Sequence, residues 1–252
     1  MKRFILAGLL ACQIQSLQAE GPAGYTEALA LYGQGKYEDS LAKVRNIFDA
    51  NRNSLHVRML AAANHSRLGR PQDAITHLQY AIKDHPESAP AVAMLAAIYR
   101  RQGNLGDAQA LIGRAIGLDG KNLDYRIESA RIYYKSGNFA AARRVVGEIL
   151  AQQSTHQEAL ALEGLILLQL GDSETAAFRL RHALMQKGGS KVFVSDIYNN
   201  MAVALRKSAE GLQKAGNPGE AAARRTEAVE MLARALELNP NNPSARANKN
   251  AN

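Results

Sequence analysis

Apolar residues recur every three or four positions along most of the chain, in short stretches that polar turns interrupt. This period places the apolar side chains on one face of an α-helix. Glycines mark the turns at a constant step of 34 residues, at Gly35, Gly69, Gly103, Gly137 and Gly171. Glycine ends a helix readily because it adopts the left-handed backbone conformation without steric strain. The pattern therefore predicts a helix, a tight turn and a second helix, repeated every 34 residues.

Small residues keep the same step within the predicted helices. In the first helix of each repeat they are Ala28, Ala62, Ala96, Ala130 and Gly164, and in the second helix Ser40, Ala74, Ala108, Ala142 and Ala176. A small side chain lets the backbones of two helices approach closely. We therefore expect the two helices of each repeat to pack as a hairpin.

The last predicted hairpin is longer than the others. Ala202, its small residue, lies seven residues further from the turn at Gly216 than the repeat requires, and Gly216 lies seven residues further from Asn239. Seven residues are close to two helical turns, so each lengthened helix keeps its phase against the other. We expect this sixth hairpin to project beyond the stack.

The segments that flank the last hairpin carry weaker signals. We expect Ser195 to cap its first helix, and residues 191–194 are then either a plain connector, the favoured interpretation, or an exposed apolar contact segment. Residues 243–252 have no apolar period and are expected to form a disordered tail.

The phased glycines and small residues resemble the tetratricopeptide repeat (TPR) family, whose unit is a 34-residue helical hairpin. His85-Pro86 and Asn239-Pro240 match a stop that often ends the family's second helix. The resemblance implies an all-α fold, a right-handed α-solenoid of about six TPR helical hairpins with the last one elongated. The array would cover residues 20–242, in units at 21–54, 55–88, 89–122, 123–156, 157–190 and 195–242.

In proteins that this chain resembles, the first helices line a concave groove that binds a protein or peptide. Carried over, the candidates are Tyr25, Tyr32, Met59, Arg67, Arg100, Arg101, Ile127, Arg131, Tyr134, Lys135, Asn199 and Arg206. The basic members can pair with carboxylates, so one hypothesis is a partner with acidic segments. The alternative is that cations near helix C-termini only complement the helix dipoles.

The first residues have the layout of a secretory signal peptide. Lys2 and Arg3 precede the apolar run 4–11, and the segment reaches Ala19, after which cleavage is expected. Cys12 follows Leu-Leu-Ala and resembles a lipoprotein cleavage box, so lipidation of Cys12 is the alternative. A signal peptide at residues 1–19 indicates a periplasmic protein. A lipidated Cys12 would make it an outer-membrane lipoprotein, and we expect membrane association only in that case.

Charge and the missing motifs narrow the function. The formal net charge is +8. For an exported protein this charge favours acidic proteins or anionic polymers as partners rather than nucleic acid. None of the six histidines has a metal-ligand spacing, and no phosphate loop or nucleophile motif occurs. We therefore expect no catalytic residue, metal or cofactor.

The resemblance and the export signal together indicate a non-catalytic protein–protein interaction scaffold in the bacterial cell envelope. It would assist assembly of a pilus, secretion or polysaccharide-export machine. One alternative is a chaperone-like or regulatory subunit that holds a secreted protein or an enzyme. Another is a module that binds anionic polysaccharide.

Overall fold

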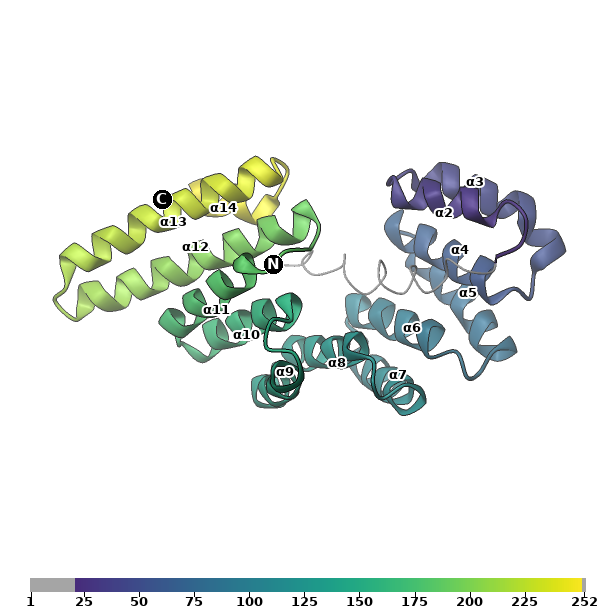
Figure 1. The fold of residues 1–252 in the computed structure, drawn as a ribbon, viewed down its shortest axis with the longest axis horizontal. Coiled ribbons are helices and arrows are strands. Elements are labelled where there is room, and N and C mark those ends of the chain that lie inside the picture. Colours follow the sequence, from purple (N-terminus) through teal and green to yellow (C-terminus); the bar gives the residue numbers. More distant parts are fainter. Residues whose placement is uncertain (1–20, 251–252) are drawn as a thin grey trace. The chain divides into compact units, whose positions relative to one another are not determined.

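The computed structural model describes residues 21–250, which are helical almost throughout and contain no strand (Figure 1). The first helices of the hairpins are α2 (Tyr25–Gly33), α4 (Leu55–Arg67), α6 (Ala89–Gln102), α8 (Leu123–Lys135), α10 (Gln157–Leu170) and α12 (Lys191–Lys214). The second helices are α3 (Tyr37–Phe48), α5 (Pro71–Asp84), α7 (Leu105–Leu118), α9 (Phe139–Gln152), α11 (Ser173–Met185) and α13 (Pro218–Leu238). A short 3-10 helix, η1 (Asp49–Asn51), and a last helix, α14 (Pro243–Asn250), complete the chain. The all-α prediction is confirmed, whereas the predicted signal peptide with Cys12 lies outside the described residues.

The turn glycines adopt the conformation that their spacing predicts. Gly35, Gly69, Gly103, Gly137 and Gly171 have φ between 75 and 93°, and so does Gly216 in the last hairpin. A side chain is strained at such angles, so glycine is the residue that lets each first helix end in a tight turn.

The small residues lie where helices meet. Ala62, Ala96 and Ala130 are fully buried, as are Ala74 and Ala108 on second helices. Gly164 shows the limit of this packing. A Cβ atom built there would approach Leu180 Cγ to 2.6 Å and the Ala176 carbonyl oxygen to 3.3 Å. The spacing of small residues therefore reflects close contact between the two helices of each hairpin.

The described chain divides into two compact units. The N-terminal unit runs to Lys135 and contains α2 to α8, and the C-terminal unit runs from Ser136 and contains α9 to α14. In the N-terminal unit one apolar cluster joins Val92 and Ala96 of α6 to Ile112 of α7 and to Tyr125 and Ile132 of α8. Each unit thus has its own core, built from helices that follow one another in sequence.

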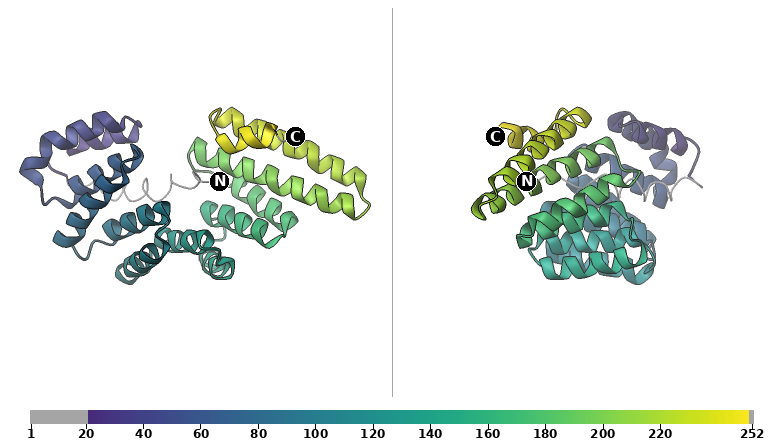
Figure 2. Two further views of the ribbon diagram at one scale, coloured as in Figure 1. Left: turned by 180° about the vertical axis from the view of Figure 1, so that it is seen from behind. Right: turned by 60° about the vertical axis from the view of Figure 1, so that its left-hand side comes forward.

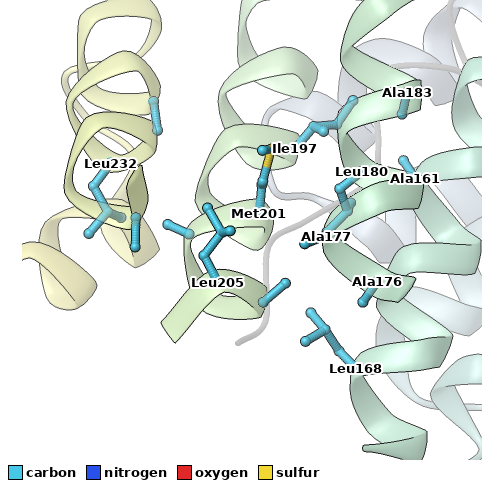
Figure 3. Packing of buried hydrophobic residues seen from close by; sticks show 14 of the residues in the cluster. Ala161, Leu168, Ala176, Ala177, Leu180, Ala183, Ile197, Met201, Leu205 and Leu232 are labelled. Atoms are coloured by element: carbon cyan, nitrogen blue, oxygen red, sulfur yellow. The ribbon is translucent and has the colours of Figure 1, made fainter. Parts of the chain in front are cut away.

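The C-terminal unit has a core that spans α10 to α13. One apolar cluster contains Leu180 of α11, Ile197, Met201 and Leu205 of α12, and Leu232 of α13, with α12 lying between α11 and α13 (Figure 3). With 24 and 21 residues, α12 and α13 are longer than the helices of every other described hairpin. Their far ends extend beyond α11 (Figures 1 and 2). The elongated last hairpin is confirmed.

The start of α12 differs from the prediction. Ser190, not Ser195, caps the helix, and its hydroxyl accepts a hydrogen bond from the Phe193 amide at 3.2 Å. Gly189, with a φ of 77°, turns the chain just before this cap. Ser195 instead lies buried inside the helix and donates to the Ala235 carbonyl oxygen at 2.7 Å. Residues 191–194 are therefore neither a connector nor a separate contact segment but the first turn of α12, whose Phe193 enters the core.

The predicted disorder of residues 243–252 is wrong for residues 243–250, which form α14. The Asn242 side chain accepts hydrogen bonds from the amides of Ser244 and Ala245, at 3.2 and 3.1 Å. Its amide also donates to Ser195 Oγ and Asp196 Oδ1, both at 2.9 Å. This start signal, followed by Pro243, favours a helix although the segment buries only Ala245.

Candidate functional site

Basic residues at the ends of first helices form a regular row in the N-terminal unit. Arg67, Arg101 and Lys135 follow one another at the repeat step of 34 residues. Arg67 Nε donates to the Tyr32 hydroxyl at 3.2 Å, and Arg101 donates to Ser66 Oγ at 2.5 Å and to the Ser66 carbonyl oxygen at 3.3 Å. Lys135 Nζ donates to the Arg101 carbonyl oxygen at 3.2 Å. Each member of this basic row therefore links its own first helix to the preceding one.

These bonds place cations against the negative ends of helices, as the dipole alternative expects. The acceptors of Arg67 and Arg101 are nevertheless uncharged oxygens. Within residues 21–250, neither guanidinium group forms an ion pair with a carboxylate. Burial and the neighbouring cations Arg100 and Arg67 lower the pKa of Arg101, although arginine stays protonated in proteins. At Arg67 and Arg101 the row therefore presents positive charge whose hydrogen-bond acceptors are neutral.

Arg100 and Arg131 have a different environment, because Glu128 lies between them. Arg100 Nε is 2.5 Å from one Glu128 carboxylate oxygen, and Arg131 Nη1 is 3.4 Å from the other. The exposed fractions are 8% for Arg100, 4% for Arg131 and 0% for Glu128. Burial raises the pKa of the Glu128 carboxyl, but the two guanidinium groups outweigh this effect and hold the pKa below its ordinary value. The structure thus gives both arginines an internal carboxylate in place of a partner's.

The apolar and aromatic candidates are mostly enclosed. Tyr25, Met59 and Ile127 are buried, and Tyr32 is nearly so. The Tyr25 ring meets the His56 ring edge-on with centroids 5.9 Å apart, and Tyr32 lies 5.2 Å from Tyr37. Tyr134 on α8 is only half-buried. Among the candidates of this unit, Arg67, Arg101, Tyr134 and Lys135 therefore present surface that a partner could contact.

The two candidates of the C-terminal unit hold α14. Asn199 is buried, and its side-chain oxygen accepts from Asn248 Nδ2 at 2.8 Å. Arg206 donates to the Asn248 carbonyl oxygen at 3.4 Å. Both residues therefore serve an intramolecular contact within the C-terminal unit.

Two important contacts escaped the sequence interpretation. Glu128 stands three residues before Arg131, a helical spacing that signals an ion pair, but its contact with Arg100 depends on how successive hairpins stack. Ser66 receives Arg101 through a contact of the same kind between repeats. No local pattern reports either contact.

The described residues offer little that suggests catalysis. Residues 21–250 contain no cluster of histidine, cysteine and carboxylate side chains that could hold a metal ion. A cleft of about 390 Å³ opens at the hairpin ends of the C-terminal unit. Two of its polar residues have structural roles, since His156 Nδ1 accepts from the Ala159 amide and Gln157 donates to the Ala183 carbonyl oxygen. None of the helices in residues 21–250 combines the length and the apolar character needed to cross a bilayer.

Comparison with known proteins agrees with this architecture. A family model described as "Tetratricopeptide repeat" matches residues 65–122 and 99–166. No curated protein matches the sequence. The chain is similar to the crystal structure of a tetratricopeptide repeat protein from Parabacteroides merdae ATCC 43184, with a TM-score of 0.73 and 12% identity, over 96% of this chain and 90% of that one. It is also similar to pilF of Pseudomonas aeruginosa (TM-score 0.65, 11% identity, 96% and 100% of the two chains). A third similar structure is a thermophilic TPR protein of Thermus thermophilus (TM-score 0.63, 18% identity, 79% and 98%).

Proposed function

We propose that this chain, which is a tetratricopeptide repeat protein, is a non-catalytic scaffold that binds other proteins. Stacked helical hairpins offer an extended surface on which a partner segment can lie. The basic row at the ends of the first helices is the surface that we assign to the partner. Its charge favours a segment with acidic residues, because guanidinium groups bind carboxylates through paired hydrogen bonds.

The observation that supports this assignment is the absence of an ion pair at Arg67 and Arg101 within residues 21–250. Where this unit buries arginines deeply, as at Arg100 and Arg131, it supplies the carboxylate of Glu128. At Arg67 and Arg101 it supplies only neutral oxygens. A carboxylate from a partner would therefore gain a charge-assisted bond without displacing an internal one.

A double substitution tests the row. A photo-reactive residue in place of Tyr134 would capture a partner in cells, and mass spectrometry would identify it. We expect Arg67→Ala with Arg101→Ala to reduce the recovery of this partner at least about fivefold. Arg143→Ala with Arg144→Ala removes the same charge from exposed positions on α9 and is the matched control. Equal losses in both variants would mean that net charge alone attracts partners, and partner recovery that neither variant changes would reject the row as the contact. Salt-sensitive retention on an anionic polymer, with no protein captured, would favour a polysaccharide-binding module instead.

We also propose export and a role in the cell envelope, in the assembly of a pilus, secretion or polysaccharide-export machine. Support comes from the order of Lys2, Arg3, the apolar run and Ala19. Sequencing the N-terminus of the protein made in bacteria tests it. A mature chain that begins at Glu20 fits cleavage in the periplasm, a lipid-modified Cys12 fits the outer-membrane alternative, and an intact Met1 in a cytosolic fraction would contradict both.

A further inference from the structure

The outer face of α11 in the C-terminal unit exposes bulky apolar side chains. Phe178 is 60% exposed and Met185 is 74% exposed. They are seven residues apart, so they lie on one face of the helix about 10 Å from each other. Two large apolar side chains on one stripe present surface that water covers unfavourably and that a second helix could cover.

A cleft lies directly beside Phe178, where the long hairpin extends past α11. The cleft has a volume of about 160 Å³. Its floor contains Ala177, Phe178 and Leu205 together with Ser208, and its rim is charged, with Glu174, Arg181 and Arg224. Neighbouring hairpins of equal length would end at the same height. Here α12 and α13 extend past the end of α11 by their extra turns, and we call the resulting offset the step. An apolar side chain inserted at this step would contact α11 and α12 at once.

Charged residues surround the step and are already fixed in place. Arg224 of α13 lies 3.3 Å from Glu174 of α11, and Arg181 of α11 pairs with Glu227 of α13. These pairs tie α11 to α13 across the cleft. Arg181 and Arg224 therefore already have carboxylate partners, and a ligand's acidic residues would pair with other cations.

Two exposed lysines near the stripe, Lys187 and Lys191, have no ion pair within residues 21–250. Between residues 173 and 191 the sequence has one carboxylate, Glu174, against Arg179, Arg181, Lys187 and Lys191. Arg179 pairs with Glu163 at 3.1 Å and Arg181 pairs with Glu227, so the charge that remains for a partner is that of the two lysines. A partner that covers the apolar stripe would meet this charge at its edges, and acidic residues beside its own apolar face would complement it.

We propose that the α11 stripe, defined as Phe178, Met185 and the cleft beside Phe178, is a second docking surface, which binds an acidic amphipathic helix of a partner protein. An aliphatic side chain of that helix occupies the cleft, and its glutamates or aspartates face Lys187 and Lys191. The surface belongs to the C-terminal unit, and the proposal does not depend on the basic row. An anionic membrane could also attract a basic and apolar helix face, but a flat bilayer cannot fill a cleft, so the geometry favours a protein.

Peptide binding to the full chain tests the proposal. The probe is a labelled synthetic helix of about 18 residues, long enough to be helical, with leucines along one face and glutamates on both sides of it. We expect this peptide to bind in a fluorescence anisotropy titration. We expect Phe178→Ser with Met185→Ser to weaken binding at least about tenfold, because both apolar contacts are lost. A version with lysines in place of the glutamates should bind far more weakly to the unchanged protein.

Matched controls make the result specific. Tyr80→Ser with Leu118→Ser removes two exposed apolar side chains from the N-terminal unit and should leave the affinity within about twofold. The variant with Arg67→Ala and Arg101→Ala should also bind the peptide normally, which separates this surface from the basic row. Thermal unfolding checks that each variant is folded. If the Phe178/Met185 variant binds the peptide with unchanged affinity, the proposal is overturned. It is also overturned if the peptide does not bind and the unchanged protein instead binds phosphatidylglycerol vesicles that the variant does not bind.

Discussion

At the scale of single residues, a buried carboxylate distinguishes two arginines of the N-terminal unit from the others. Glu128 is enclosed between Arg100 and Arg131 and accepts from both. Charged groups taken out of water are tolerated when each has a partner, and removal of one member leaves the others without compensation. Arg100 and Arg131 therefore stabilise the N-terminal unit, whereas Arg67 and Arg101, which have only neutral acceptors, are the arginines that we assign to a partner.

Removal of the Glu128 carboxylate should be costly. We expect Glu128→Ala to lower the free energy of unfolding by about 3 kcal/mol or more, because two buried guanidinium groups lose their counter-charge. Urea denaturation followed by circular dichroism measures the change. Glu148→Ala is the control, because the Glu148–Arg144 pair is exposed and such pairs contribute about 0.5 kcal/mol or less. Equal effects of the two substitutions would show that the buried group has no special energetic role.

A second buried carboxyl, Asp196 at the start of α12, makes stability depend on pH. Burial raises its pKa to about 7, although the hydrogen bond from Asn242 opposes this shift. In the unfolded chain an aspartate has a pKa of about 3.9. Between these values the folded protein binds a proton that the unfolded chain has lost, so stability falls as the pH rises through this window.

We expect Asp196→Asn to remove this dependence, because asparagine is neutral and can still accept from Asn242. Urea denaturation at pH 5 and pH 8 should show a decrease for the unchanged protein that the variant reduces by about 1 kcal/mol or more. Other titrating groups affect both proteins alike, so the difference between them isolates Asp196. An identical pH dependence in the two proteins would contradict the raised pKa.

At the scale of elements, α14 is held mainly by polar contacts around one residue. The side chain of Asn242 joins α14 to Ser195 and Asp196 and caps the first turn. Asn199 and Arg206 add bonds to Asn248. The helix thus depends on a buried hydrogen-bond network more than on apolar area.

Asn242→Ala should therefore detach α14. We expect a loss of about 2 kcal/mol in stability, because the substitution removes a helix cap and leaves buried polar groups without partners. Hydrogen exchange of the amides in residues 243–250 should increase at the same time. Asn241→Ala, at the exposed neighbouring position, should change neither quantity by much. Slow exchange in α14 of the Asn242 variant would show that other contacts suffice to hold it.

The elements that the sequence predicted well are those with a periodic signal. The turn glycines and small residues repeat at 34 positions, so the hairpins and the long sixth pair followed from spacing alone. The cap at Ser190 was missed because Ser195 is also a good capping residue, and the choice depends on Gly188 and Gly189 turning the chain. The helix α14 was missed because one asparagine, rather than an apolar face, secures it.

The candidate site was harder to predict than the fold. Spacing placed the basic residues near the ends of first helices, where Arg67, Arg101 and Lys135 are found. Spacing could not show that Arg100 and Arg101 have different partners. Adjacent residues on a helix point in different directions, and spacing does not tell which direction meets a carboxylate. One meets Glu128 and the other meets Ser66. Only the stacking of successive hairpins determines which arginine is compensated.

At the scale of the whole molecule, the two units offer surfaces of different chemistry. The basic row belongs to the N-terminal unit and the α11 stripe to the C-terminal unit. In a repeat array each hairpin contacts mainly its neighbours, so a surface substitution in one unit should leave the other unit intact. The substitutions at Arg67 and Arg101 and those at Phe178 and Met185 can therefore be combined, and we expect each to abolish only its own interaction.

The equal lengthening of α12 and α13 also constrains how this hairpin can change over generations. A loss of seven residues from one helix alone would leave the apolar residues of the other helix without a facing partner. A loss from both would shorten the hairpin and keep its register. We therefore expect the two added segments to be gained or lost together. Homologues in which only one of the two helices is lengthened should be rare. The step beside Phe178 would appear and disappear with these segments.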